Sequence, residues 1–451
     1  MNPRYTEETN RQPAFLLVLL VLAISTIVVG RSAISLITDV SSVESVGSSP
    51  VFVFLTLAGA LSLVLITYRW VFHLVLLMIP SRAAPKPNSD IFVSAVVPAF
   101  NEEQGIRKTI KSLAGQDYKN MEILVIDDGS KDDTFKIAQE FAAEINDNNV
   151  EGGINVRVLT QENGGKSSAL NHGLREASGT ILLTVDADSE LASDAVSKAV
   201  RWFADPEVDG VAGQVKVSNR NTALTRLQNL EYLIGNTVYR RSQGLFGSVL
   251  LVPGPIALFR ISSLTDMVDE ESRPSIFLND TFAEDFEVSM AMLVKNKRIV
   301  YDPEAVAYTV APNTLSSLVS QRYRWIRGNM QVCRKFLRTI KTEDCPGSMR
   351  TLFWMSPTFL FELSLLPLIV LFSISGLLTA SFAGYRLPSV EWLVVLPLLT
   401  LCIGAISVYT QKDKLSSLIV VPLYDVLYGT LLTVVWVIAV IDELRNTKMS
   451  W

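Results

Sequence analysis

Charge is distributed very unevenly along this chain. Residues 81–350 carry 66 of the 85 Lys, Arg, Asp and Glu residues, and the other 181 residues carry only 19. A charged centre between apolar ends excludes a wholly water-soluble protein, a disordered chain and a collagen-like one. The net charge of -5 provides no overall basic field for nucleic acid. We therefore predict a folded domain framed by membrane helices, with no nucleic-acid partner.

The cysteine and histidine content limits the chemistry that the chain can perform. Cys333, Cys345 and Cys402 have no paired spacing, which excludes a disulfide scaffold and a cysteine zinc site. The chain has only two His residues. Histidine-centred metal sites and catalytic triads are therefore disfavoured.

The apolar ends contain five candidate membrane spans. Residues 13–30 carry no charge and can cross about 30 Å of hydrocarbon. Glu7 and Glu8 in the leader favour an uncleaved helix over a signal peptide. The other spans are predicted at 51–67, about 355–380, 390–409 and 416–441. Two spans before the charged domain and three after it, with Lys412 and Lys414 in a short connection, predict a cytoplasmic domain.

Two ionisable residues, Glu362 and Asp425, fall inside these predicted spans. Such groups are costly in a membrane and often functional. They can form interhelical or headgroup-level hydrogen bonds, or they can line a polar path for a product. Tyr424 and Tyr428 beside Asp425 favour the path slightly, and both interpretations stay open.

The charged centre alternates apolar runs with helical segments. Strands are predicted at 91–100, 121–128, 154–160, 179–188 and 208–215, and helices at 102–115, 132–145, 167–177 and 193–203. Runs that are almost purely apolar fit buried parallel strands. The alternation predicts an α/β domain with a mostly parallel sheet. Ligands of such sheets bind beyond the carboxyl ends of the strands.

Acidic residues stand at several of these strand ends. A single Asp there is usually a turn former, and we interpret Asp132 and Asp133 in that way. Asp186 and Asp188 flank one small residue after a buried strand, and like charges so close together repel. Because hard oxygen ligands suit Mg²⁺ or Mn²⁺, this pair predicts a metal–diphosphate site.

A glycine turn precedes Lys166. Gly164-Gly165-Lys166-Ser167-Ser168 lacks the first glycine of a P-loop at the required spacing, which disfavours a P-loop ATPase. A turn that delivers Lys166 to a phosphate remains compatible with the pattern. His172 on the following helix is interpreted as structural.

Six motifs occur in a fixed order: VSAVVPAFNEE (93–103), VIDDGSKDDT (125–134), NGGKSSALNHG (163–173), VDAD (185–188), AED (283–285) and QRYRW (321–325). This set resembles the family 2 inverting glycosyltransferases, specifically the processive membrane polysaccharide synthases that make cellulose, chitin, hyaluronan and poly-N-acetylglucosamine. The resemblance implies a GT-A-like α/β nucleotide-sugar domain inserted between transmembrane helices. The implied segments are two transmembrane helices in 1–80, a cytosolic GT-A domain in 81–320, an amphipathic interfacial segment in 321–350 and three transmembrane helices in 351–451.

The same resemblance implies roles for individual residues. Asp285 would be the general base, although Ala283 stands where the family has Thr. The metal ligands would be Asp186 and Asp188. The nucleotide sugar would be bound by Pro98, Ala99, Glu102, Asp127, Asp128, Lys166 and Asp186. The acceptor and diphosphate would be bound by Gly254, Pro255, Glu284, Gln321, Arg324 and Trp325.

The chemistry of these residue types fits inverting transfer. A carboxylate at Asp285 can take the proton of an attacking hydroxyl. A cation on Asp188, aided by Lys166 and Arg324, can stabilise a departing diphosphate. Trp325 offers an aromatic face to a sugar, with interfacial anchoring as the alternative. Residues 321–341 carry seven basic residues and no acid, which predicts contact with anionic lipid.

The predicted function is that of a hexosyltransferase of the plasma membrane. It would add sugars from UDP-GlcNAc or UDP-glucose to a growing β-linked polysaccharide and export the product. The alternative is transfer of a single sugar to a lipid or polyprenyl phosphate. A transporter or receptor with a degenerate domain is disfavoured by the complete acidic set. The sugar, the linkage and the need for an accessory membrane subunit are left open.

Overall fold

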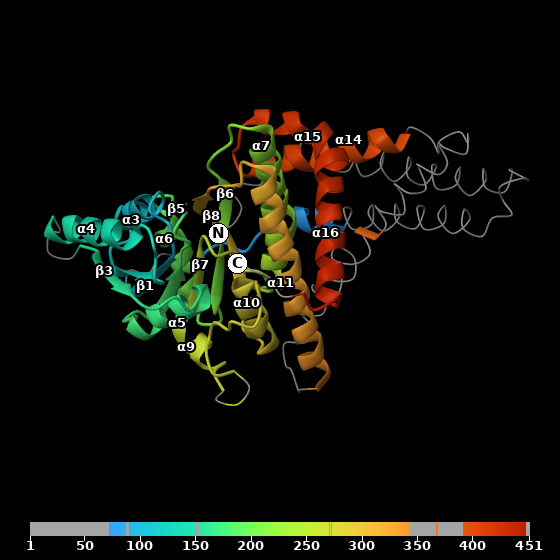
Figure 1. Cartoon of the computed structure of the whole chain (residues 1–451). Coiled ribbons are helices and arrows are strands. Elements are labelled where there is room, and N and C mark those ends of the chain that lie inside the picture. The colour runs from blue at the N-terminus through green and yellow to red at the C-terminus, as the bar shows by residue number, and fades with distance from the viewer. Residues whose placement is uncertain are drawn as a thin grey trace, which may run out of the picture. The chain divides into compact units, whose positions relative to one another are not determined.

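The computed structural model describes residues 72–86, 90–148, 153–269, 271, 273–342, 353, 367–368 and 391–447. The chain divides into two compact units (Figure 1). The first, here called the sheet unit, comprises 81–232 and 243–356. The second, here called the apolar unit, comprises 1–80, 233–242 and 357–451.

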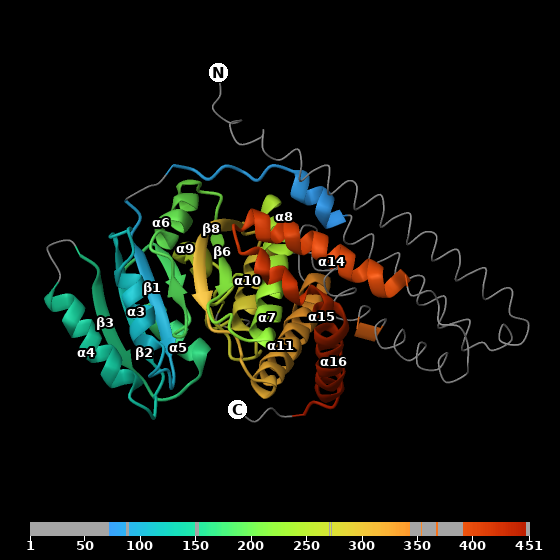
Figure 2. The ribbon, with the colours of Figure 1, turned by 90° about the horizontal axis from the view of Figure 1, so that it is seen from above.

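One eight-stranded sheet forms the centre of the sheet unit, in the order β3-β2-β1-β4-β7-β6-β8-β5. Figure 2 labels β3, β2 and β1 toward one end of this sheet and β6 and β8 farther along it. The strands are β1 (Val93–Ala99), β2 (Met121–Asp127), β3 (Asn155–Thr160), β4 (Ile181–Thr184), β5 (Glu190–Leu191), β6 (Gly210–Val217), β7 (Ala257–Arg260) and β8 (Ile299–Thr309). The first four strands pair in parallel, and so do β6 and β8. Strand β7 is antiparallel to β4 and β6, and β5 is antiparallel to β8. The predicted α/β fold with a mostly parallel sheet is confirmed.

The helices between β1 and residue 342 are α3 (Ile106–Ala114), α4 (Thr134–Asp147), α5 (Lys166–Glu176), α6 (Ala195–Val200), η2 (Arg201–Ala204), α7 (Ala223–Ile234), η3 (Gly235–Arg240), α8 (Arg241–Leu245), α9 (Ile261–Thr265), α10 (Glu284–Val294) and α11 (Leu315–Thr342). Of these, η3 belongs to the apolar unit. Helices α3, α4 and α6 cover one face of the sheet, and α5 lies on the other (Figure 1). Alternate residues of β1 face opposite sides of the sheet. Val97 packs in the core on the side of α3, whereas Val96 lies against Gly173 of α5 on the other side. Burial on both faces explains the nearly continuous apolar runs.

Strand β4 is shorter than predicted. It ends at Thr184, and the N–H of Val185 still donates to the carbonyl of Val96 at 3.1 Å. Asp186, Ala187 and Asp188 then leave the sheet in a turn. The acidic pair therefore lies just beyond the carboxyl end of a central strand, where ligands of such sheets bind.

Helix α10 is unusual because it is buried nearly all round. Every residue from Phe286 to Val294 is buried, as expected for a helix that is apolar on all sides. Its first turn carries three acids, Glu284, Asp285 and Glu287. Negative charge at a helix N-terminus is favourable because the backbone N–H groups there are unpaired.

The apolar unit contains α14 (Glu391–Thr410), η5 (Leu415–Val420), α15 (Val421–Leu423), η6 (Tyr424–Tyr428) and α16 (Gly429–Leu444). The stretch Leu415–Leu444 is the one helix within the described ranges that is long and apolar enough to cross a membrane. It matches the predicted span 416–441. A shorter apolar helix, Pro397–Thr410, lies within the predicted span 390–409.

The other predicted spans, 13–30, 51–67 and 355–380, lie outside the described residues apart from 367–368. Glu362 also lies outside them. Asp425 accepts a hydrogen bond at 3.0 Å from Thr400 Oγ1 of α14. Such an interhelical hydrogen bond is one of the two interpretations that the sequence left open for Asp425.

Candidate active site

Lys166 joins two acidic groups from distant parts of the chain. It begins α5, and its Nζ lies 2.7 Å from Asp186 Oδ1 and 2.7 Å from Glu284 Oε1. Glu284 begins α10 and Asp186 follows β4. The surrounding pocket is lined by six residues that the sequence predicted: Pro98, Lys166, Asp186, Gly254, Glu284 and Asp285. The fold therefore brings together motifs that are up to 187 positions apart in the sequence.

Asp285 has the properties of a general base. The N–H of Phe286 donates to its Oδ1 at 2.8 Å. Burial, followed by the neighbouring charge of Glu284, raises the pKa of Asp285 to about 6. At pH 7 the carboxylate is still mostly ionised, yet it is more basic than an ordinary aspartate. Both properties favour proton abstraction near neutral pH.

Lys166 and Glu284 hold each other in the charged form. Burial alone would lower the pKa of Lys166, but the charges of Asp186, Glu284 and Asp285 outweigh it and raise that pKa well above its usual range. Burial alone would raise the pKa of Glu284, but the nearby ammonium of Lys166 lowers it. The Lys166 side chain remains 39% exposed, so the ammonium can also meet an incoming anion.

The loop that carries Asp186 and Asp188 is fixed by three hydrogen bonds. Thr109 Oγ1 of α3 donates to the carbonyl of Ala187 at 2.7 Å. The N–H of Ser189 donates to the carbonyl of Asp186 at 3.0 Å, and its hydroxyl donates to Asp188 Oδ1 at 3.1 Å. The backbone of this loop is thereby fixed beside the pocket that Asp186 lines.

Two carboxylates near Asp186, those of Asp188 and Glu102, are harder to ionise than isolated ones. Burial and the charge of Asp186 raise the pKa of Asp188. Burial and the charges of Asp188 and Asp186 raise the pKa of Glu102 to about 7. This excess of negative charge and the hard oxygen donors fit a divalent cation such as Mg²⁺ or Mn²⁺. Within the described part of the chain, however, no group of three or more His, Cys, Asp and Glu residues forms a ready-made metal site.

Gly254 passes directly over the carboxylate of Asp186. A Cβ placed on Gly254 would lie 2.7 Å from Asp186 Oδ2 and 2.9 Å from Oδ1, closer than real Cβ contacts allow. Pro255 follows it and is partly exposed. Any side chain at this position would therefore have to displace the Asp186 carboxylate.

Asp127 and Asp128 are buried, with 3% of each exposed. Thr160 Oγ1 donates to Asp127 Oδ2 at 2.9 Å. The carboxylate of Asp128 accepts the N–H groups of Gly164 at 2.9 Å and Gly165 at 2.8 Å, and the side chain of Gln161 at 2.7 Å. Asp128 therefore shapes the turn before Lys166, a role that the sequence did not reveal. The carbonyl of buried Ala99 accepts the N–H of Asp128 at 2.8 Å.

The QRYRW motif lies near the start of α11. Arg324 is exposed, and its charge helps to lower the pKa of Glu284. Gln321 and Trp325 are partly buried. These three residues do not line the pocket that the described residues form around Lys166. Their predicted contact with acceptor or diphosphate therefore stays a prediction. Of the three, Arg324 is the one whose charge acts on a pocket residue, Glu284.

The basic run of α11 differs from the prediction. Arg322 stacks at 4.3 Å over the Trp325 ring and lies 2.6 Å from Glu231 of α7. Arg327 is 3% exposed and donates to the Tyr323 hydroxyl at 3.2 Å. Lys335 forms ion pairs within the sheet unit. These three bases thus contact rings and acids of the protein itself, whereas the sequence predicted contact with anionic lipid for residues 321–341.

The pocket is also lined by apolar residues that the sequence analysis did not single out. These residues are Leu170, Val252, Ala257, Phe259, Phe277 and Val288. They lie on helices, strands and connections whose apolar residues resemble any other core positions in the sequence. Only the tertiary structure distinguishes them.

The comparisons with known proteins agree with this arrangement. A family model described as Glycosyl transferase family 2 matches residues 94–267, and one described as Glycosyl transferase family group 2 matches residues 181–408, half of the chain. The chain therefore belongs to the family 2 glycosyltransferases, and the predicted class is confirmed.

Individual relatives give a finer comparison. The chain is 33% identical over 258 residues to the poly-beta-1,6-N-acetyl-D-glucosamine synthase of Staphylococcus aureus (strain COL), covering 56% of this chain and 58% of that one. It is 34% identical over 272 residues to the N-acetylglucosaminyltransferase of Rhizobium meliloti (strain 1021), with the same coverages. The match thus spans somewhat over half the length of these curated relatives.

Among solved structures, the chain is similar to the mannosyltransferase PcManGT from Pyrobaculum calidifontis, solved with GDP-Man and Mn²⁺. The TM-score is 0.61 at 21% identity, covering 88% of this chain and 99% of that one. At this identity the likeness shows the fold alone, and it confirms the predicted GT-A-like fold.

Proposed function

We propose that this protein transfers sugars from a UDP-sugar to a growing β-linked polysaccharide, with inversion at the anomeric carbon. The observation that carries the proposal is the contact of Lys166 with Asp186 and Glu284 in a pocket also lined by Asp285. An ammonium for a diphosphate and a basic carboxylate for a hydroxyl thus occur in one pocket. The names of two relatives, a poly-N-acetylglucosamine synthase and an N-acetylglucosaminyltransferase, favour UDP-GlcNAc over UDP-glucose as the donor.

In the proposed reaction Asp285 accepts the proton of the acceptor hydroxyl as that oxygen attacks the anomeric carbon. Lys166 and Arg324 face the negative charge that develops on the departing diphosphate. Asp186 and Asp188 would hold a divalent ion, which would supply further positive charge to the diphosphate when bound. Glu102, Asp127 and Asp128 would border the nucleotide, and Gln321 and Trp325 would contact the acceptor.

The proposal includes a membrane location. Leu415–Leu444 and Pro397–Thr410 supply apolar helices after the sheet unit. With the spans predicted before it, they would form a multi-pass membrane part that carries the product outward, with the sheet unit in the cytosol. An accessory membrane subunit is compatible with this arrangement.

The product of the purified membranes tests the proposal. Incubation with radiolabelled UDP-GlcNAc, UDP-glucose and other nucleotide sugars is expected to yield a long, glycosidase-sensitive polymer from UDP-GlcNAc. Gel filtration and linkage analysis would identify that polymer. A single labelled lipid would instead indicate transfer of one sugar to a lipid or polyprenyl phosphate, and it would contradict processive synthesis.

Substitution of the glycine above Asp186 gives a second test. Gly254→Ala is expected to slow sugar transfer by about tenfold or more, because the new Cβ must displace the Asp186 carboxylate. Initial rates at saturating donor would show the loss. Gly235→Ala is the matched control, since its Cβ would meet no described atom within 4 Å. Equal rates in the two variants would refute the assigned role of this contact.

A further inference from the structure

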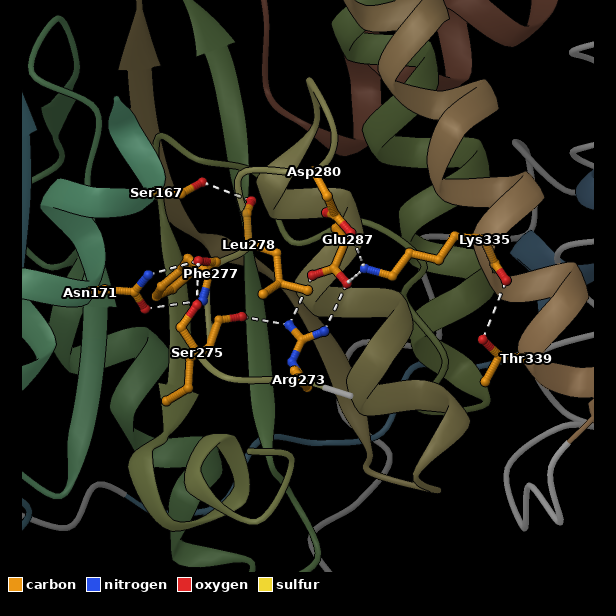
Figure 3. Close-up of polar contacts among 11 residues, drawn as sticks. Ser167, Asn171, Arg273, Ser275, Phe277, Leu278, Asp280, Glu287, Lys335 and Thr339 are labelled. Atoms are coloured by element: carbon orange, nitrogen blue, oxygen red, sulfur yellow. Dashed lines mark hydrogen bonds and ion pairs between the residues drawn. The ribbon is translucent and has the colours of Figure 1, made fainter. Parts of the chain in front are cut away.

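A buried ion pair lies on the helix that carries Asp285. Glu287 of α10 is fully buried, and Arg273 contacts it through two parallel bonds (Figure 3). Arg273 Nη1 donates to Glu287 Oε1 at 2.7 Å, and Nη2 donates to Oε2 at 2.8 Å. This bidentate geometry fixes both direction and distance, unlike a single contact between flexible side chains.

Lys335 extends the ion pair to α11. Its Nζ lies 2.7 Å from Glu287 Oε1 and 2.7 Å from Asp280 Oδ2. Figure 3 shows Glu287 between Arg273 and Lys335. Two acids therefore face two bases, and the helix with QRYRW is connected to the helix with Asp285.

The segment 273–280, here called the bridge segment, also contacts α5. Asn171 forms two hydrogen bonds with the backbone of Phe277. Its Nδ2 donates to the Phe277 carbonyl at 2.7 Å, and its Oδ1 accepts the Phe277 N–H at 3.1 Å. Ser167 Oγ donates to the carbonyl of Leu278 at 3.0 Å (Figure 3). Asn279 Nδ2 donates to the carbonyl of Gly164 at 3.2 Å, at the turn before Lys166. The bridge segment is thus attached on both sides of Lys166.

Helix α11 also packs without intervening side chains against the residue before Glu284. A Cβ on Gly328 would lie 2.9 Å from both the Cβ and the N of Ala283. This contact fixes the start of α10 against α11, and it explains why a small residue suits position 283. The N-terminus of α10 is therefore held from two sides, by Gly328 and by the ion pair of Glu287.

We propose that the ion cluster of Arg273, Glu287 and Lys335 is a positioning device that sets the location of Asp285 relative to Lys166. The proposal rests on the proposed function. A continuous set of hydrogen bonds runs from the Lys166 turn through the bridge segment to Glu287, two residues after Asp285. Neither Arg273 nor Glu287 is among the described residues that line the pocket, so both act through the backbone of α10. Small displacements of reacting groups are costly, with losses of roughly 10²-fold for about 1 Å.

The double variant Arg273→Met/Glu287→Leu separates positioning from stability. Replacing both members of a buried ion pair by apolar residues of similar size often preserves stability, because no unpaired charge remains. Apolar contacts lack the direction of the bidentate bonds. We expect an apparent unfolding temperature near that of the wild type in detergent, an unchanged KM for the UDP-sugar, and a kcat lowered by about tenfold or more.

Two further variants complete the experiment. Lys335→Met removes one contact of Glu287 and leaves its bonds to Arg273. Because the Lys335 side chain is 30% exposed, stability should not change, and kcat is expected to fall about threefold. Arg157→Met/Glu176→Leu removes a 2.6 Å ion pair at the other end of α5 and should leave kcat unchanged.

The outcomes are distinct. A stable double variant with wild-type kcat would overturn the positioning role and leave the proposed function intact. If the double variant fails to fold, Lys335→Met decides, and a wild-type kcat in it would equally overturn the proposal. A wild-type protein that transfers no sugar from any UDP-sugar would refute the proposed function, and the positioning role with it.

Discussion

Asp285→Asn is expected to reduce sugar transfer by roughly 10²–10⁴-fold, the range that a positioned general base contributes. The amide keeps the size of the side chain and can still accept the N–H of Phe286, but it cannot take a proton. UDP binding should change little. Asp186 and Glu284 also raise the pKa of Lys166, so Lys166 keeps its positive charge when the charge of Asp285 is removed. Single-turnover rates and calorimetric UDP titration would separate the two effects.

The pH profile of the wild type provides an independent check on the same residue. Because burial and Glu284 raise the pKa of Asp285 to about 6, the active ionised form is lost as the pH falls through that value. The kcat/KM should therefore decline below about pH 6 and level off above it. Asp266→Asn, which alters an exposed ion pair with Lys297, should preserve both rate and profile. Near-normal turnover in Asp285→Asn would show that another group is the base.

Removal of divalent cations is expected to abolish transfer, and Mn²⁺ or Mg²⁺ should restore it. Burial and the charge of Asp186 raise the pKa of Asp188, and burial with the charges of Asp188 and Asp186 raises the pKa of Glu102, so crowded acidic groups here would also repel a diphosphate. Dialysis against a chelator followed by rate measurement with each metal would test this. Direct titration of Mn²⁺ by electron paramagnetic resonance would report binding without any turnover.

Asp188→Asn is the matching substitution. It removes one hard anionic oxygen ligand, and we expect the metal concentration for half-maximal rate to rise about 10-fold or more. Asp194→Asn, at the start of α6, is a suitable control because Asp194 lies away from the pocket lining. Full activity after chelation would contradict the metal assignment.

Local sequence patterns were sufficient for the first half of the sheet unit. Strands β1 to β3 and helices α3 to α5 lie within a few residues of their predicted bounds, because buried strands are continuously apolar and helices alternate with them. Strands β7 and β8 were missed. Strand β7 has only four residues, and β8 contains Asp302, Pro303 and Glu304, which interrupt its apolar pattern.

The residues of the candidate site were predictable where a sequence motif contains them. They were not predictable where a side chain is bound by residues far away in the sequence. The ordered motifs indicated Lys166, Asp186 and Asp285, which the fold brings to one pocket. Nothing local indicates that Glu287 binds Arg273 and Lys335, because those partners are 14 and 48 positions away. The bases of α11 were likewise interpreted without the acids that the fold places beside them.

Helix α10 combines a reactive first turn with a body that is buried on every side. Substitutions at Met290 or Met292, both fully buried, would disturb packing and move Asp285 at the same time. A random screen for inactive variants would therefore recover core positions of α10 alongside true site residues. Only a measurement of protein abundance or unfolding on each variant would sort the two groups.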